Sequence, residues 1–195
     1  MRKIKLQMQI SLDGFVAGPT GEQYWMVWNW DDTLKQYVSD LADSVDTLLI
    51  GRVTYEGMAN YWPSAAENPG ASAEEINFAN KMNALNKVVF STTLSTVTWC
   101  NSRIAAASVK EEVATLKQMP GKDLIIYGGA RIVSSFIKLG LIDEYHLFVN
   151  PVAVGNGMPI WKEIDDRIPL KLTNTVTSSS GIIILCYLPE KNTPN

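Results

Sequence analysis

The sequence contains one histidine, His146, and two widely separated cysteines, Cys100 and Cys186, among its 195 residues. Zinc sites need three or four His, Cys or carboxylate ligands, so this scarcity argues against a resident metal. The HxE…PCxxC signature of zinc-dependent deaminases does not occur, nor does the GxSxG motif of serine hydrolases. The two isolated cysteines are typical of reduced thiols in a cytoplasmic protein. His146 is expected to be a half-buried strand residue or a subunit contact.

The sequence also lacks an excess of basic residues and long apolar runs. With 17 Lys and Arg against 20 Asp and Glu, its net charge of −3 gives no basic signature for nucleic acid. No run reaches the roughly 18 apolar residues of a membrane span, and the start MRKIK leads into an alternating segment, unlike a signal peptide. We expect a cytoplasmic protein without nucleic-acid or membrane partners, with one domain at 1–189 and a polar tail at 190–195.

Short apolar runs separated by amphipathic segments predict alternating strands and helices. Strands are expected at 3–12, 46–51, 86–91, 102–107, 122–128, 142–150, 169–178 and 181–188. Helices are expected at 31–45, after Gly51, and at 72–85, 108–119 and 130–140, with an irregular connection at 62–71. This order predicts an α/β fold with a mixed, mostly parallel sheet covered by helices on both faces. The last two strands, joined by SSSG, predict a C-terminal antiparallel hairpin.

The apolar strand in DLIIYGGARIV ends at Gly128 and Gly129, just before a helix that opens with Arg131. A helix N-terminus exposes backbone N–H groups that attract an anion, and glycine lets a phosphate approach because it has no Cβ. A tight strand-to-helix turn without a ligand is the alternative explanation. Arg131 adds a cationic group that can contact a phosphate.

A second turn of this kind, in TLLIGRVTYEGM, places Arg52 and Thr54 directly after Gly51. Parallel strands bring both turns to the carboxyl edge of the sheet, where open α/β sheets bind ligands. Neither turn fits GxGxxG or the P-loop GxxxxGK[ST], so an ordinary Rossmann or nucleotide-hydrolase site is not indicated. For Arg52, a solvated surface arginine is the alternative.

Five sequence blocks follow one another between residues 3 and 188: MQISLDGFVAGPTGE, LLIGRVTYEGM, KVVFSTTL, LIIYGGARIV and LIDEYHLFVNPVAVGNGMPIW. This series resembles the dihydrofolate reductase-like superfamily, and more closely the C-terminal reductase domain of the bifunctional riboflavin-biosynthesis deaminase/reductase. The resemblance implies a dihydrofolate reductase-like three-layer sandwich, NADPH as the cofactor and a homodimer.

The resemblance also implies where NADPH binds. The adenosine-side phosphates would contact Gly51, Arg52 and Thr54, and the adenosine ribose would contact Ser91, Thr92 and Thr93. The pyrophosphate would contact Gly128, Gly129, Ala130 and Arg131. The nicotinamide would lie beside Val16, Ala17 and Gly18. Within the first group, Arg52 would lie near the 2′-phosphate.

Two aspartates are candidates for the reacting centre. Asp13, in SLDGF, follows the first strand where nicotinamide and substrate would meet, as an acid or a polar anchor. A turn residue is the alternative for Asp13. Dihydrofolate reductases place a carboxylate on the helix after the first loop, and Asp31 or Asp32 falls near that position. A helix N-cap is the alternative for these two.

The loop YWMVWNWDD is rich in tryptophan, and Trp25 and Trp28 could stack on a flat heterocycle or pack the loop itself. We predict an NADPH-dependent reductase of a small flat heterocycle, pterin-like or pyrimidine-like, by hydride transfer. One alternative is the 5-amino-6-(ribosylamino)uracil phosphate reductase step of riboflavin biosynthesis. Another is a non-catalytic nucleotide-binding module.

Overall fold

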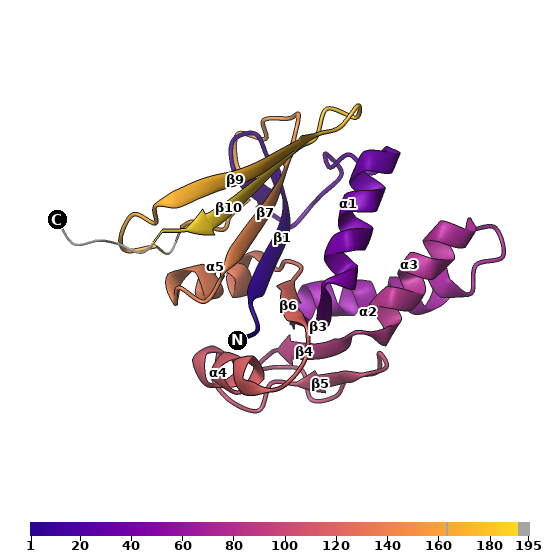
Figure 1. Ribbon diagram of the computed structural model, residues 1–195, viewed down its shortest axis with the longest axis vertical. Coiled ribbons are helices and arrows are strands. Elements are labelled where there is room, and N and C mark those ends of the chain that lie inside the picture. The colour runs from indigo at the N-terminus through magenta and orange to yellow at the C-terminus, as the bar shows by residue number, and fades with distance from the viewer. Residues whose placement is uncertain (163, 191–195) are drawn as a thin grey trace.

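The computed structural model describes residues 1–162 and 164–190. Its main sheet contains eight strands: β1 (Ile4–Ser11), β3 (Val45–Gly51), β4 (Asn86–Phe90), β5 (Ser102–Ile104), β6 (Asp123–Ile126), β7 (Glu144–Asn150), β9 (Leu170–Thr177) and β10 (Ile183–Pro189). They lie in the order β5-β4-β3-β6-β1-β7-β10-β9 (Figure 1). The strands from β5 to β7 are parallel, whereas β10 pairs antiparallel with both β7 and β9. The predicted mixed sheet with a C-terminal hairpin is confirmed.

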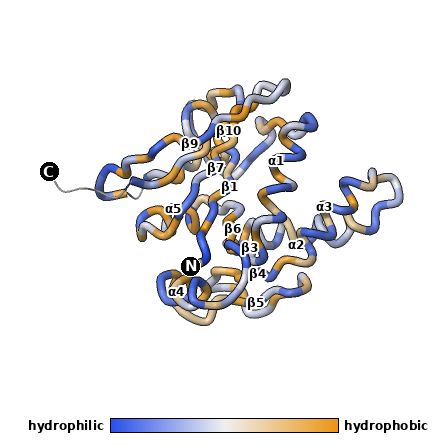
Figure 2. Tube along the Cα trace, viewed as in Figure 1, coloured by the Kyte–Doolittle hydropathy of each residue, from blue (hydrophilic) through white to orange (hydrophobic). Residues whose placement is uncertain are grey.

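Helices cover both faces of this sheet: α1 (Asp32–Asp43), α2 (Arg52–Ala66), α3 (Ala73–Ala84), α4 (Val109–Gln118) and α5 (Ala130–Lys138). Alternate residues of β3 point to opposite faces. Leu49 joins an apolar cluster with side chains of α4 and α5, while Leu48 and Ile50 join a cluster with α1, α2 and α3. The fold is therefore a three-layer α/β/α sandwich (Figure 1). The connection between α2 and α3 is hydrophilic and projects away from the sheet (Figure 2).

The five helices begin in two different ways. In α1, α3 and α4, a side chain caps the first turn, since Asp31, Ser72 and Ser108 each accept a hydrogen bond from a backbone N–H. In α2 and α5, the N-cap residues are Gly51 and Gly129, and neither helix has a side-chain cap. The two uncapped helices are the two that follow the glycine turns.

Three sequence predictions are corrected. Helix α2 continues through Pro63 to Ala66, so residues 62–66 are helical where an irregular connection was expected. Proline removes a helical N–H, but Trp62 packs edge-on against Phe78 of α3, with ring centroids 5.4 Å apart, and this contact holds the last turn. The strand expected at 102–107 ends at Ile104. A small second sheet, β2 (Phe15–Ala17) with β8 (Met158–Pro159), was not predicted.

The predicted polar tail at 190–195 lies outside the described residues except for Glu190, whose N–H donates to Pro169 O at 2.9 Å. Among the described residues, no helix combines the length and apolar character needed to cross a membrane.

Candidate functional site

The two glycine turns meet at the carboxyl edge of the sheet, because β3 and β6 are parallel neighbours. A Cβ added to Gly129 would lie 3.8 Å from the Cα of Gly51 and 3.4 Å from Thr54 Oγ1. A Cβ on Gly51 would lie 3.1 Å from Ile132 Cγ2. The structure therefore brings together Gly51, Thr54 and Gly129, which the sequence places in two separate segments.

Both glycines of the second turn have backbone conformations that L-residues rarely adopt, with φ of +85° at Gly128 and +81° at Gly129. The Met8 side chain of β1 packs beneath Gly128, where its Sδ lies 3.6 Å from the position of an added Cβ. The turn therefore has no side chain in front of α5, with Gly128 buried and Gly129 partly exposed. This is the surface that a phosphate group requires.

The electrostatics of this edge favour an anion. Each uncapped helix N-terminus carries a partial positive charge of roughly half an elementary charge. Arg52 lies on the first turn of α2 and Arg131 is exposed on the first turn of α5. Arg52 is paired with Glu56 one turn further along, at 2.9 Å, with both side chains nearly half exposed. An anionic ligand that binds the Arg52 guanidinium group must therefore compete with the Glu56 carboxylate.

The turn after β4 lies next along the same edge. Ser91 Oγ accepts hydrogen bonds from the N–H groups of Thr93 at 3.1 Å and Leu94 at 2.9 Å. The Ser91 hydroxyl therefore holds its own turn, while Thr92 and Thr93 are exposed beside it. These two threonines are the residues of this segment that are open to a ligand.

The segment Val16, Ala17 and Gly18 is buried, with Val16 only 2% exposed. Val16 and Ala17 belong to β2, which pairs with β8. The Gly18 N–H donates to Glu22 O at 2.8 Å and closes the following turn. The whole segment is therefore packed within the protein.

Asp13 joins the first loop to the loop after β7. Its carboxylate accepts hydrogen bonds from the Ser11 hydroxyl at 2.6 Å, from the Gly155 N–H at 2.7 Å and from the Val154 N–H at 3.1 Å. These bonds, with Ser11 first, lower the pKa of Asp13 to about 2. An acid of this strength is ionised at neutral pH, so the geometry favours the polar anchor over the proton donor.

The two aspartates before α1 have different environments. Asp31 caps α1 through the Leu34 N–H, at 3.0 Å, and also accepts hydrogen bonds from Ser178 and Ser179 in the β9–β10 turn. The bond from Leu34, followed by that from Ser179, lowers the pKa of Asp31. Asp32 lies in the first turn of α1 with an exposed side chain. Asp31 is therefore the N-cap, and Asp32 is the carboxylate open to solvent.

The tryptophan loop ends in an aromatic column on β7. Trp28 stacks on Trp30, and Trp30 stacks on Phe148, with ring centroids 6.0 Å apart in each pair. Trp28 is 63% exposed, so one end of the column is open. Trp25 is half-buried, and its indole nitrogen is enclosed without a partner among the described residues.

The family model for the RibD C-terminal domain matches residues 2–184. The chain belongs to this family. It is 36% identical over 187 residues to "Uncharacterized protein YyaP" of Bacillus subtilis (strain 168), covering 95% of this chain and 94% of that one. RibD-type reductase domains have a dihydrofolate reductase-like fold, which confirms the fold predicted from the sequence.

Solved structures show the same fold. A putative riboflavin biosynthesis protein from Shewanella sp. PV-4 superposes with a TM-score of 0.72 at 18% identity, covering 98% of this chain and 100% of that chain. A deaminase/5-amino-6-(5-phosphoribosylamino)uracil reductase from Thermotoga maritima superposes with a TM-score of 0.67 at 17% identity. That match covers 97% of this RibD C-terminal domain and 57% of the longer Thermotoga chain.

Sequence reasoning missed Asn150, the last residue of β7 in this RibD C-terminal domain. It is fully buried, accepts a hydrogen bond from the Val27 N–H at 2.9 Å and donates to Gln9 Oε1 at 2.9 Å. Asn150 therefore fixes the tryptophan loop to β1 and β7. A polar residue closing the apolar strand EYHLFVN was the available signal.

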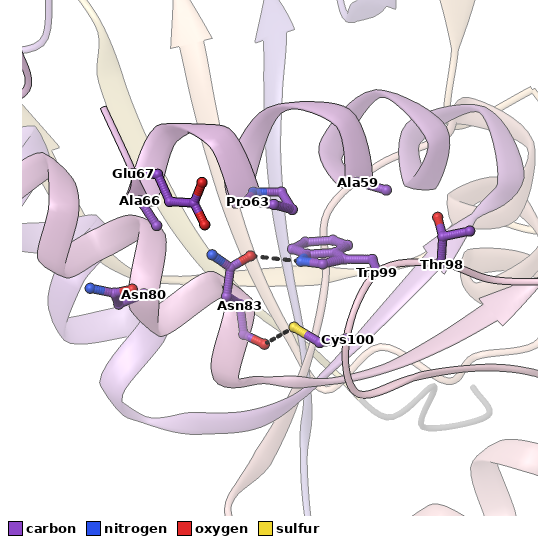
Figure 3. Close-up of a pocket in the computed structure, with 9 residues that line it drawn as sticks. All are labelled: Ala59, Pro63, Ala66, Glu67, Asn80, Asn83, Thr98, Trp99 and Cys100. Carbon is purple, nitrogen blue, oxygen red and sulfur yellow. Dashed lines mark hydrogen bonds between the residues drawn. The ribbon is translucent and has the colours of Figure 1, made fainter. Parts of the chain in front are cut away.

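A cavity of about 450 Å³ lies away from the glycine turns, between the ends of α2 and α3 and the segment 98–100 (Figure 3). The residues that line this cavity are Ala59, Pro63, Ala66, Glu67, Asn80, Asn83, Thr98, Trp99 and Cys100. None of them is a candidate cofactor residue. Within the described residues, no group of three His, Cys, Asp or Glu side chains could hold a metal ion.

Proposed function

We propose that this RibD C-terminal domain is an NADPH-dependent reductase of a small flat heterocycle. The observation that carries the proposal is the meeting of two uncapped helix N-termini, at Gly51 and Gly129. A dinucleotide carries a pyrophosphate, and NADPH adds a 2′-phosphate, so it needs several anion-binding groups close together. Family membership supports the reductase assignment.

Each turn has a separate part in binding the cofactor. The backbone of Gly128 and Gly129, with Arg131 beside it, holds the pyrophosphate. Arg52, which can leave its exposed ion pair with Glu56, contacts the 2′-phosphate and selects NADPH over NADH. The bound cofactor supplies the hydride.

The substrate lies between the first loop and the tryptophan loop. Trp28 offers its exposed ring to a flat heterocycle, and Trp25 belongs to the same loop. Asp13 keeps the loops at 12–14 and 153–155 together at the reacting centre. Asp32, the exposed carboxylate at the start of α1, is the catalytic candidate that is free to contact the substrate ring.

A second candidate function is the reduction of a ribosylaminouracil phosphate in riboflavin biosynthesis. It is favoured by the family model and by the fold shared with the Thermotoga maritima enzyme. Turnover of the phosphorylated aminouracil, but not of a pterin, would select this function over the broader one.

We also propose a cytoplasmic homodimer. Strand β9 forms the edge of the sheet, and most of its residues are exposed. Leu172 is 50% exposed and Ile183 of the adjacent β10 is 40% exposed. A second copy that pairs along β9 would cover the side chain of Leu172.

Thermal unfolding with NADPH, with NADH and without ligand tests the cofactor. Ligand at about 100 times its Kd adds ~2.7 kcal/mol to the unfolding free energy, which raises the midpoint by roughly 5–10 °C in a chain of this length. We expect a clear shift with NADPH and a smaller one with NADH. Arg52→Gln should reduce only the NADPH shift. Glu56→Gln is the matched control, because it removes the competing partner of Arg52 and should leave the NADPH shift at least as large as in the parent.

Each outcome has a distinct meaning. A folded sample with no shift from either nucleotide contradicts the cofactor assignment and with it the reductase. A shift with NADPH but no oxidation of NADPH with any pterin or pyrimidine supports a non-catalytic nucleotide-binding module.

A further inference from the structure

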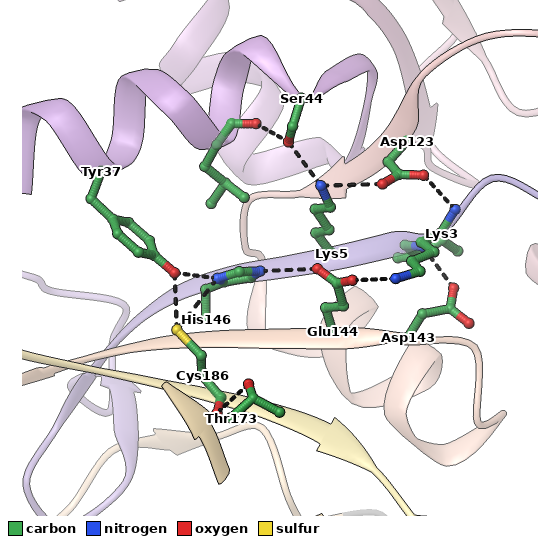
Figure 4. Close-up of polar contacts among 12 residues, drawn as sticks. Lys3, Lys5, Tyr37, Ser44, Asp123, Asp143, Glu144, His146, Thr173 and Cys186 are labelled. Atoms are coloured by element: carbon green, nitrogen blue, oxygen red, sulfur yellow. Dashed lines mark hydrogen bonds and ion pairs between the residues drawn. The ribbon is translucent and has the colours of Figure 1, made fainter. Parts of the chain in front are cut away.

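A cluster of ionisable side chains lies between α1 and the sheet (Figure 4). Tyr37 of α1 places its hydroxyl oxygen 2.6 Å from His146 Nδ1 and 2.9 Å from Cys186 Sγ. His146 Nε2 faces Glu144 Oε2 at 3.6 Å, and Glu144 is paired with Lys3 at 2.7 Å. Because Glu144 begins β7, it lies at the edge of the sheet opposite to the glycine turns. The proposed reductase makes no use of this cluster.

The three contacts form a continuous path for a proton. With neutral His146, Nδ1 is the acceptor and Tyr37 donates its only hydrogen to it. The Tyr37 oxygen is then free to accept the S–H of Cys186. Shifting both protons one step along this path produces a Cys186 thiolate and a His146 imidazolium that faces the Glu144 carboxylate. The arrangement is that of a nucleophile, a base and a group that orients the base.

The surroundings favour this charged arrangement. Burial raises the pKa of the Cys186 thiol, but hydrogen bonds from His146 and Tyr37 outweigh burial and lower it below its usual range. Burial lowers the pKa of His146, whereas contacts with Cys186 and Glu144 raise it, and the net direction is upward. The nearby His146 imidazole, 3.6 Å away, is the main reason that the pKa of Glu144 falls to about 2. On β1, the residue opposite His146 is the uncharged Gln7.

The other cysteine, Cys100, lies beside the Lys87 ammonium, which donates to the Cys100 backbone oxygen at 3.2 Å. Cys100 is exposed, and its thiol contacts the backbone oxygen of Asn83 at 3.2 Å. Cys186 is only 6% exposed but lies within 3.8 Å of His146 Nδ1. Accessibility alone predicts that Cys100 reacts first, whereas thiolate character predicts Cys186. Cys100 therefore serves as an internal control for the reactivity of Cys186.

We propose that Cys186 is a site of oxidation by small hydroperoxides. The Cys186 thiolate attacks one peroxide oxygen, so that an S–O bond forms and the O–O bond breaks. The His146 imidazolium gives its proton to the departing oxygen. With hydrogen peroxide, the products are a sulfenic acid on Cys186, neutral His146 and water: the sulfur is oxidised and the peroxide is reduced. Hydrogen peroxide is close to water in size, so it suits a thiol with little exposure.

Oxidation also has a structural consequence. The 2.9 Å separation of Cys186 Sγ and Tyr37 Oη leaves no room for an added oxygen between them. An oxygen added on the Tyr37 side of the sulfur would push Tyr37, and with it α1, away from β10. Helix α1 follows directly on the loop that carries Trp28, and its cap Asp31 is bonded to the β9–β10 turn. Oxidised protein should therefore unfold at a lower temperature than reduced protein.

The test exposes the full-length protein to hydrogen peroxide in the presence of dimedone, which traps sulfenic acids, and follows each cysteine by peptide mass spectrometry. We expect dimedone labelling of Cys186 to exceed that of Cys100. His146→Gln and Tyr37→Phe should each slow the labelling of Cys186 about tenfold, because each removes a partner that stabilises the thiolate. Thr173→Val is the matched control, because it removes only the hydrogen bond to the Cys186 carbonyl oxygen and should not change the rate.

Circular dichroism identifies any variant that fails to fold. If His146→Gln does not fold, Tyr37→Phe, which keeps the aromatic ring, provides the comparison with the parent protein. Labelling in denaturant gives the intrinsic rate of each thiol and normalises the folded values. Labelling confined to Cys100, or Cys186 labelling that is unchanged in the folded variants, overturns the proposal.

Discussion

Gly129 links backbone conformation to the proposed cofactor site. Its φ of +81° costs an L-residue about 1–2 kcal/mol, and an added Cβ would lie 3.2 Å from Ile132 Cγ2 and 3.4 Å from Thr54 Oγ1. We predict that Gly129→Ala lowers stability by about this amount and weakens NADPH binding about tenfold, because the methyl group would press on Ile132 and Thr54 and force apart the two turns proposed to bind phosphate. Fluorescence titration with NADPH, alongside thermal unfolding, measures both effects.

Gly140→Ala is the matched control for Gly129→Ala. Gly140 also has a positive φ, +62°, but nothing lies within 4 Å of an added Cβ. It ends α5 at the far side from the glycine turn, so its substitution should reduce stability and leave NADPH affinity unchanged. Equal affinities in the two variants would contradict the phosphate assignment.

The hydrogen bonds of the Asp13 carboxylate predict how the stability of the fold depends on pH. Its folded-state pKa of about 2 lies below the usual 3.8, so its hydrogen bonds stabilise the fold fully above about pH 4 and are lost as the pH falls through 2. Asp13→Asn replaces an acceptor by an amide that cannot satisfy both the Val154 and Gly155 N–H groups. We predict that the variant is less stable than the parent near neutral pH and that the difference narrows toward about pH 2. Urea unfolding across this range provides the measurement, and a constant difference would argue against the anchor role.

Lys87 gives a second prediction about the pH dependence of stability, in the alkaline range. It is 1% exposed, its ammonium donates to Asn83 O and Cys100 O, and burial lowers its pKa to about 8. Between about pH 8 and 10.5 the unfolded chain holds more protons at this site than the folded chain, so stability should rise with pH. Lys87→Met should abolish that rise when unfolding free energies are compared across this window. A parallel rise in the variant would place its origin elsewhere.

At the scale of the element, the helix caps are encoded locally. Ser108 of α4 forms a capping box with Glu111, and the Ser-x-x-Glu pattern alone was sufficient to predict it. We predict that Ser108→Ala costs about 1 kcal/mol, or roughly 2–4 °C in midpoint by calorimetry. Ser64→Ala is the control: its exposed hydroxyl bonds only to carbonyls of its own helix, so the change should stay within about 0.5 kcal/mol. Equal losses in the two variants would remove the cap as the cause.

Local signals predicted the long strands and the capped helices because periodicity and caps depend on nearby residues. They failed where distant contacts decide the structure. The last turn of α2 is helical despite Pro63, because Trp62 packs on Phe78 of another helix. The pairing of β2 with β8 joins segments of two or three residues, too short to leave a periodic pattern.

At the scale of the whole molecule, the site was predictable in part. Parallel strands have their carboxyl ends on one edge, so the turns at Gly51 and Gly129 could be assigned to the same edge from the sequence. That they touch depends on β6 lying directly beside β3, which only the folded sheet shows. The hydrogen bond between Asn150 and Val27 spans 123 positions in the chain, so a polar residue at the end of β7 could be noticed in the sequence but its partner could not.

The sheet itself suggests how two copies would associate. Its parallel side is closed by the short β5, whereas the opposite side ends in the eight-residue β9 with exposed side chains. Long unprotected edges pair readily with other strands, and a two-fold pairing of β9 with itself would satisfy both edges at once. Leu172, which is 50% exposed on this strand, would then be covered.

We predict that the protein is a dimer by light scattering at micromolar concentration and that Leu172→Lys makes it a monomer, because the added charge would have to be buried against a second copy. Leu139→Lys is the control, since Leu139 is similarly exposed, at 46%, but lies at the end of α5. A parental protein that is monomeric under these conditions would refute the dimer. If both variants remained dimeric, the two copies would associate through a surface other than β9.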